Sequence, residues 1–60
     1  MTEPLLLKPQ EVADRLGVGK ATVHRMIRAG QLPYVLVGTD RRVPTRAVEE
    51  WVHRSTVPAR

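Results

Sequence analysis

The feature that most constrains the fold is a turn of three residues, Gly17 to Gly19, between two helical patterns. The first pattern, residues 9–16, begins with Pro9, whose fixed φ and missing N–H suit the first position of a helix. Gly17 can adopt the left-handed conformation that ends many helices, and Val18 is expected to fill the space between the two helices. Two helices joined by so short a turn are typical of a helix-turn-helix.

The two helical patterns bury similar side chains but expose different ones. Their inward apolar residues are Val12, Ala13 and Leu16 in the first pattern, and Val23, Met26 and Ile27 in the second. Gly19 is the expected N-cap of the second pattern, which covers residues 20–29 and ends at Gly30. The outward side of the second helix carries Ala21, His24, Arg25 and Arg28. This side is basic, whereas the outward side of the first helix is mixed in charge.

The segment after Pro33 has the features of a β-hairpin followed by a third helix. Residues 34–37 are apolar and include the β-branched Val35 and Val37, residues 38–40 favour a turn, and residues 41–43 can return antiparallel. The expected tip is Thr39 to Arg42, with both arginines at the end of a projecting ribbon. Thr45 is expected to cap the third helix with its hydroxyl group. The buried stripe expected for this helix is Ala47, Val48, Trp51 and Val52.

Together these patterns predict one domain that is mainly α-helical with a small β-hairpin. The element order, α-turn-α-β-β-α, is that of a winged helix-turn-helix. We expect the domain to span residues 1–54, and residues 55–60, which include Pro58 and show no periodicity, to form a flexible tail. The 60-residue chain contains no cysteine, so packing alone must stabilise this small fold.

Basic residues are concentrated in the middle of the chain. The net charge of the whole chain is +4, but residues 20–46 hold six basic residues and one acid, a net charge of +5. Such a polarised charge indicates a polyanionic partner, because each phosphate paired with Lys or Arg releases counterions. The alternative is a solvated face that only aids solubility.

The basic face of the second helix and the hairpin are the candidate DNA-binding surfaces. Arg25 and Arg28 can each reach a guanine edge, and Ala21 can pack on a thymine methyl group. Near the helix N-terminus, Lys20 and Thr22 are better placed for phosphate, and His24 is a further candidate phosphate contact. The candidate wing residues are Thr39, Arg41 and Arg42. The alternatives are an ordinary amphipathic helix with solvated arginines and a charged edge strand that discourages aggregation.

Other function classes find little support in the sequence. His24 and His53 lack partners at metal-ligand spacing, and no catalytic triad, carboxylate pair or phosphate-binding loop is visible. We therefore expect no enzymatic activity, no cofactor and no metal. The longest apolar run near the N-terminus, Leu5 to Leu7, is too short for a signal peptide or a membrane span. A soluble, intracellular protein without membrane contact is expected.

Much of the sequence resembles the excisionase-type helix-turn-helix family, which belongs to the winged-helix superfamily of the mercury-resistance regulators. The resemblance covers residues 5–54, and its segments are residues 8–13, 16–33, 37–38, 42–44 and 47–51. It implies that residues 20–29 form the recognition helix, with DNA-facing residues Thr22, His24, Arg25 and Arg28, and that Arg41 and Arg42 belong to the wing. Two residues depart from the family pattern. Lys8 stands where the family often has Ser or Thr, and Gly19 stands where Ser is common.

The resemblance also implies how such a protein acts. Excisionases of this kind are recombination directionality factors: copies bind side by side on direct repeats of double-stranded DNA, bend it and bias a partner integrase toward prophage excision. The expected protein is a monomer without DNA and works in the cytoplasm of a bacterial host, on the nucleoid. The same family includes short transcriptional regulators that bind promoter repeats. A third possibility is an adapter that presents the basic helix to an acidic protein.

Overall fold

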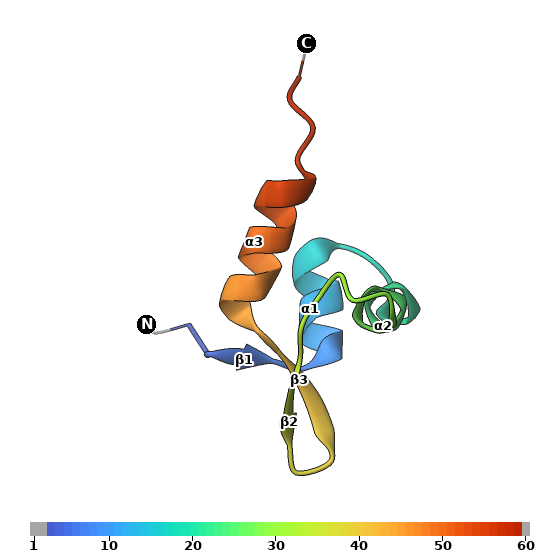
Figure 1. The fold of residues 1–60 in the computed structure, drawn as a ribbon, viewed down its shortest axis with the longest axis vertical. Coiled ribbons are helices and arrows are strands. Elements are labelled where there is room, and N and C mark those ends of the chain that lie inside the picture. The colour runs from blue at the N-terminus through green and yellow to red at the C-terminus, as the bar shows by residue number, and fades with distance from the viewer. Residues whose placement is uncertain (1–2, 60) are drawn as a thin grey trace.

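The computed structural model describes residues 3–59, which form three helices and three short strands (Figure 1). In chain order these are β1 (Leu6–Leu7), α1 (Pro9–Leu16), α2 (Lys20–Arg28), β2 (Val35–Val37), β3 (Asp40–Pro44) and α3 (Thr45–Ser55). Residues 1, 2 and 60 lie outside the described residues. The predicted start of the domain, residue 1, and the predicted end of the tail, residue 60, are among them. The predicted architecture, a mainly helical winged helix-turn-helix, is confirmed.

The helix-turn-helix forms at the predicted positions. Pro9 is the first residue of α1, and the turn contains Gly17, whose φ of 71° is left-handed. The N–H groups of Gly17 and Val18 both donate to the carbonyl oxygen of Ala13, which satisfies the open end of α1. The prediction that Val18 fills the space between the helices is wrong, because its side chain is 40% exposed. The buried residues of α1 and α2 belong to one core cluster, so the two helices pack together without Val18.

The sheet has a strand that the sequence did not indicate. Its order is β1-β3-β2, all antiparallel, with Leu7 opposite Val43 and Val35 opposite Arg42. β1 has two residues, which is too short to show an alternating pattern. Leu7 is nevertheless buried beside Val43, so β1 joins the N-terminal segment to the hairpin.

The hairpin turn is tighter than predicted. Val37 pairs with Asp40, so the loop is Gly38 and Thr39, and Gly38 has a positive φ of 64°, as the first position of a type II′ turn requires. Because Asp40 belongs to β3, the predicted tip of Thr39 to Arg42 is wrong. Arg41 lies opposite Leu36, and Arg42 lies one residue farther from the turn, opposite Val35. The hairpin projects away from the three helices, with α1 between α2 and α3 (Figure 1).

One core holds the elements together. Its buried residues are Leu7, Val12, Ala13, Val23, Met26, Ile27, Leu32, Val43 and Val48, and the partly buried residues packed against it are Leu16, Ala47 and Trp51. The interpretation of Trp51 as a packing residue is therefore confirmed. Val52 was predicted to be buried, but its side chain is 45% exposed and lines a cleft described below.

Thr45 has a different role from the one predicted. The N-cap position of α3 belongs to Pro44, and Thr45 is the first helical residue. Its hydroxyl donates to the carbonyl oxygen of Pro4, and its N–H donates to that of Leu5 over 2.9 Å. Thr45 therefore fastens the segment before β1 to the start of α3 instead of capping the helix. Residues 56–59 contain neither helix nor strand, and no helix within residues 3–59 is long and apolar enough to cross a membrane.

Candidate nucleic-acid interface

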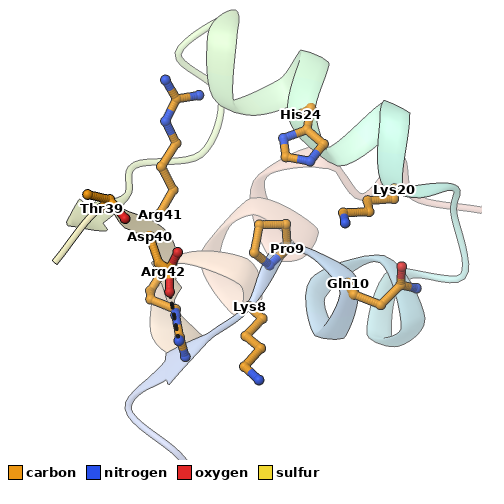
Figure 2. Close-up of a pocket in the computed structure, with 9 residues that line it drawn as sticks. All are labelled: Lys8, Pro9, Gln10, Lys20, His24, Thr39, Asp40, Arg41 and Arg42. Carbon is orange, nitrogen blue, oxygen red and sulfur yellow. Dashed lines mark ion pairs between the residues drawn. The ribbon is translucent and has the colours of Figure 1, made fainter. Parts of the chain in front are cut away.

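A groove of about 620 Å³ lies between the hairpin, the first turns of α2 and the start of α1 (Figure 2). The residues that line it are Lys8, Pro9, Gln10, Lys20, His24, Thr39, Asp40, Arg41 and Arg42. Four of them are lysines or arginines and one is an acid, so the groove is positively charged at neutral pH. Low-dielectric walls of one charge sign concentrate the field and attract a polyanion.

Helix α2 presents its basic side because its apolar side is anchored in the core. Val23, Met26 and Ile27 are buried, which directs the opposite side of the helix to solvent. The first turn contains no acid, and the N-terminal end of the helix, at Lys20, borders the groove. The N-terminal end therefore combines a lysine with backbone N–H groups, a combination suited to an anion.

Arg25 is oriented by a neighbour one turn away. Its guanidinium Nη2 donates to Thr22 Oγ1 over 3.0 Å, which limits the positions that the side chain can take. A guanidinium has five N–H donors, so this bond leaves enough donors for bidentate recognition of a ligand. Arg25 and Arg28 are both exposed on the outer side of α2.

The two wing arginines are held in different ways. The Arg41 guanidinium lies over the Tyr34 ring, 5.2 Å from its centroid, a distance typical of a cation–π contact. Arg42 forms an ion pair with Asp40, with 3.6 Å between Nη2 and Oδ2. Figure 2 shows the two side chains extending to opposite sides of β3, as the two-residue repeat of a strand requires.

The structure divides the predicted site residues into two areas. The groove brings together Lys20, His24, Thr39, Arg41 and Arg42. The remaining predicted residues lie on α2 outside the groove, and they are Ala21, Thr22, Arg25 and Arg28. Thr22 is half-buried and the other three are exposed.

Lys8 and Gln10 line the groove but were not among the predicted site residues. The N–H of Lys8 donates to Glu11 Oε1 over 2.8 Å, which forms half of a capping box. An ammonium group cannot accept the reciprocal backbone bond, so the Lys8 side chain has no capping role and extends along the groove (Figure 2). The sequence signal that could have indicated Lys8 was its position, because a lysine directly before Pro9 lies at the N-terminal end of a helix.

Within the described part of the chain, no group of three or more His, Cys, Asp or Glu side chains could hold a metal ion. The basic groove also contains a single carboxylate, Asp40, which is already paired with Arg42. The chemistry that this arrangement offers is the binding of anions through ammonium, guanidinium and helix N–H groups.

Comparisons with known proteins agree with this architecture. The family described as a helix-turn-helix domain matches residues 6–56, a range that contains all the helices and strands described above. An excisionase of Streptomyces ambofaciens is 41% identical over 49 residues, a match that covers 82% of this chain and 79% of that protein. A protein of Saccharopolyspora erythraea, provisionally named an excisionase, is 30% identical over 50 residues, 83% of this chain and 51% of that protein.

A third relative, from Mycobacterium tuberculosis strain H37Rv, is provisionally named a DNA-binding protein. It is 42% identical over 50 residues, which cover 83% of this chain and 64% of that protein. The chain thus spans between about half and four-fifths of the length of these relatives. The matched region contains both helices of the helix-turn-helix, the wing and α3. From its architecture and these matches, the chain belongs to the excisionase-type helix-turn-helix family.

Proposed function

We propose that this protein is a sequence-specific, architectural DNA-binding protein, an excisionase that directs integrase-mediated recombination toward prophage excision. It binds direct repeats cooperatively and bends the DNA between them. The observation that carries this proposal is the basic groove that joins the start of α2 to the wing, in a chain 41% identical to an excisionase. A helix and a ribbon that share one positive surface suit a duplex, whose major and minor grooves lie side by side.

Helix α2 reads bases in the major groove. An α-helix with its side chains is about 10–12 Å wide, and the major groove of B-DNA is about 12 Å wide, so the outer side of α2 can enter it. Arg25 and Arg28 bind guanine edges, and Ala21 contacts a thymine methyl group. Thr22 helps to orient Arg25 through the hydrogen bond between their side chains.

The groove residues hold the sugar–phosphate backbone. Lys20 and His24 from α2 and Thr39, Arg41 and Arg42 from the wing all line this groove. Contacts of this kind fix the position of a protein on the duplex but carry little sequence information. They make the affinity depend strongly on salt.

The small size of the domain supports cooperative binding. One recognition helix and a short wing offer few contacts, and a single module buries less surface than most sequence-specific complexes do. Useful occupancy therefore needs copies on neighbouring sites, which raise each other's effective concentration. Without DNA the protein is a monomer. Copies side by side on direct repeats bend the DNA and present it to the integrase.

A transcriptional regulator is the second candidate function. The Mycobacterium tuberculosis relative is as similar to this chain as the Streptomyces excisionase is, and its name speaks only of DNA binding. A regulator would use the same helix and wing on promoter repeats. The location of the binding sites in the genome separates the two functions.

The test is to recover fragments of the source genome with the purified protein at physiological salt, sequence them and footprint the enriched region. Evenly spaced protections beside an integrase gene are the expected result. One or two protections over a promoter would replace the excisionase proposal with the regulator. No enrichment would overturn DNA binding altogether and favour an adapter that binds an acidic protein through α2.

A further inference from the structure

The outer strand of the wing carries an exposed apolar surface. Tyr34 and the three residues of β2 have side chains that are 42–61% exposed, and Leu36 is the most exposed of them. β2 is an edge strand, because the sheet order is β1-β3-β2. None of these four residues lines the basic groove. Apolar side chains on an edge strand favour association, and proteins usually avoid them unless a partner covers them.

A second apolar surface of the opposite shape lies elsewhere on the molecule. A cleft of about 290 Å³ opens between α1 and α3, and its apolar lining is Leu7, Leu16, Val48 and Val52. Val52 contributes an exposed side chain, although it occupies a position on the apolar stripe of α3. The cleft and the basic groove have no residue in common. A protein can therefore occupy the cleft while the groove contacts DNA.

We infer that β2 of one copy docks into the α1–α3 cleft of the next copy, with Leu36 as the apolar anchor. This inference rests on the proposed function, because adjacent DNA sites bring the two copies together. Each copy carries both surfaces, so the protein itself supplies the partner that each surface needs. Contact between unlike surfaces is heterologous, and it continues from copy to copy in one direction. Direct repeats, which place every copy in the same orientation, match this geometry.

Charge supports a second copy as the occupant of the cleft. In the hairpin, Arg41 lies directly opposite Leu36, so the docking strand approaches with a positive charge beside its anchor. At the cleft, Glu49 lines the wall, and Glu50 follows it on α3. The one basic residue of the cleft, Arg15, already makes two hydrogen bonds to Glu3. The basic hairpin therefore meets a wall whose basic residue is already paired with Glu3 and which also carries the acid Glu49.

The size of the contact explains why it operates on DNA. Stable protein interfaces bury about 800 Å² on each partner, and a strand of three residues cannot cover so much. The contact is therefore too weak to hold copies together in solution. On neighbouring repeats the effective concentration is high enough for a weak contact to produce cooperativity.

The test compares affinities for DNA fragments with one repeat and with two repeats. Leu36→Asn removes the anchor and Val52→Asn spoils the cleft, and neither change alters the net charge. Val57→Asn is the matched control, because Val57 is 84% exposed and lies outside both surfaces. We expect wild-type protein and the control to bind the second repeat at least about tenfold more tightly than the first. Each of the other two variants is expected to lose that gain and to keep its one-repeat affinity.

Mixing the two variants gives the sharper result. On two repeats, one arrangement brings the intact β2 of the Val52→Asn protein to the intact cleft of the Leu36→Asn protein. A heterologous contact therefore predicts partial recovery of cooperativity in the mixture. Cooperativity that survives both single changes, or a mixture that recovers nothing, would overturn the inference and leave the proposed function standing. A wild type that binds one repeat but shows no cooperativity on two would overturn the inference together with the cooperative binding proposed above. A wild type that fails to bind one repeat overturns the proposed function instead.

Discussion

The helix-turn-helix and the hairpin use apolar residues in opposite ways. In α1 and α2, the apolar side chains at helical spacing turn inward, and Val12 and Val23 are completely buried. In β2, every side chain of an equally apolar run is exposed. Burial stabilises a fold, whereas exposed apolar surface costs solubility unless a partner covers it. The apolar residues of the helix-turn-helix therefore serve the fold, and those of the hairpin serve contacts outside the chain.

The largest expected effect comes from making the same change, leucine to alanine, at one buried and one exposed position. Leu32 is 1% exposed and Leu36, four residues later, is 61% exposed. We expect Leu32→Ala to lower the free energy of unfolding by about 2–5 kcal/mol, which is comparable to the whole stability of about 3–5 kcal/mol available to a domain of this size. Leu36→Ala should change it by less than about 0.5 kcal/mol. Urea denaturation followed by circular dichroism measures both, and equal losses would contradict the comparison.

The next effect distinguishes the helix from the wing in DNA binding. Arg25→Ala and Arg28→Ala are each expected to cost about 1–3 kcal/mol of affinity for the specific site, or about 5- to 150-fold, and the double variant should lose specific binding. Arg41→Ala should weaken binding to all sequences alike and reduce the dependence on salt. Titrations of specific and random duplexes at several salt concentrations measure this. Equal loss on both duplexes for the Arg25 variant would refute base reading by α2.

A smaller effect concerns the aromatic ring beneath Arg41. We expect Tyr34→Leu to weaken DNA binding by about 0.5–1 kcal/mol, because the guanidinium loses the ring that holds it over the wing. Tyr34→Phe keeps the ring and should bind as the wild type does. In the Arg41→Ala background, Tyr34→Leu should have no further effect. If its effect on affinity persists in that background, Tyr34 acts independently of Arg41.

The smallest effect lies at a surface ion pair that joins the N-terminal segment to α1. Two hydrogen bonds from Arg15 lower the pKa of the Glu3 carboxyl below its ordinary value. The stabilisation is therefore complete above the ordinary pKa of glutamate and is lost as the pH falls through the lower folded value. Both groups are exposed, so the change is small. Melting temperatures of wild type and Glu3→Gln should differ slightly at neutral pH and converge in acid, and a difference that grows in acid would contradict the assignment.

Much of the fold could be predicted because its signals are local. The limits of α1 agree with the predicted residues 9–16, and α2 ends one residue before the predicted end. Pro9, Gly17 and Gly30 act through their own backbone conformations, and the inward residues of both helices follow from a repeat of 3.6 residues. Five of the nine predicted site residues also line the groove, because both α2 and the hairpin are short and continuous in sequence.

The tertiary structure decided what depends on distant partners. β1 exists because β3 pairs with it, and Thr45 turns away from a capping role because Pro4 and Leu5 lie beside it. Lys8 joins the groove only because α1 begins next to the wing.

The sequence alone determined the helices, their glycine turns and the basic surface of α2, since each depends on residues within a few positions of one another. Which strand completes the sheet and which apolar residues remain exposed depended on where distant segments meet. No local pattern records such meetings, because the free energy of a long-range contact belongs to both segments at once.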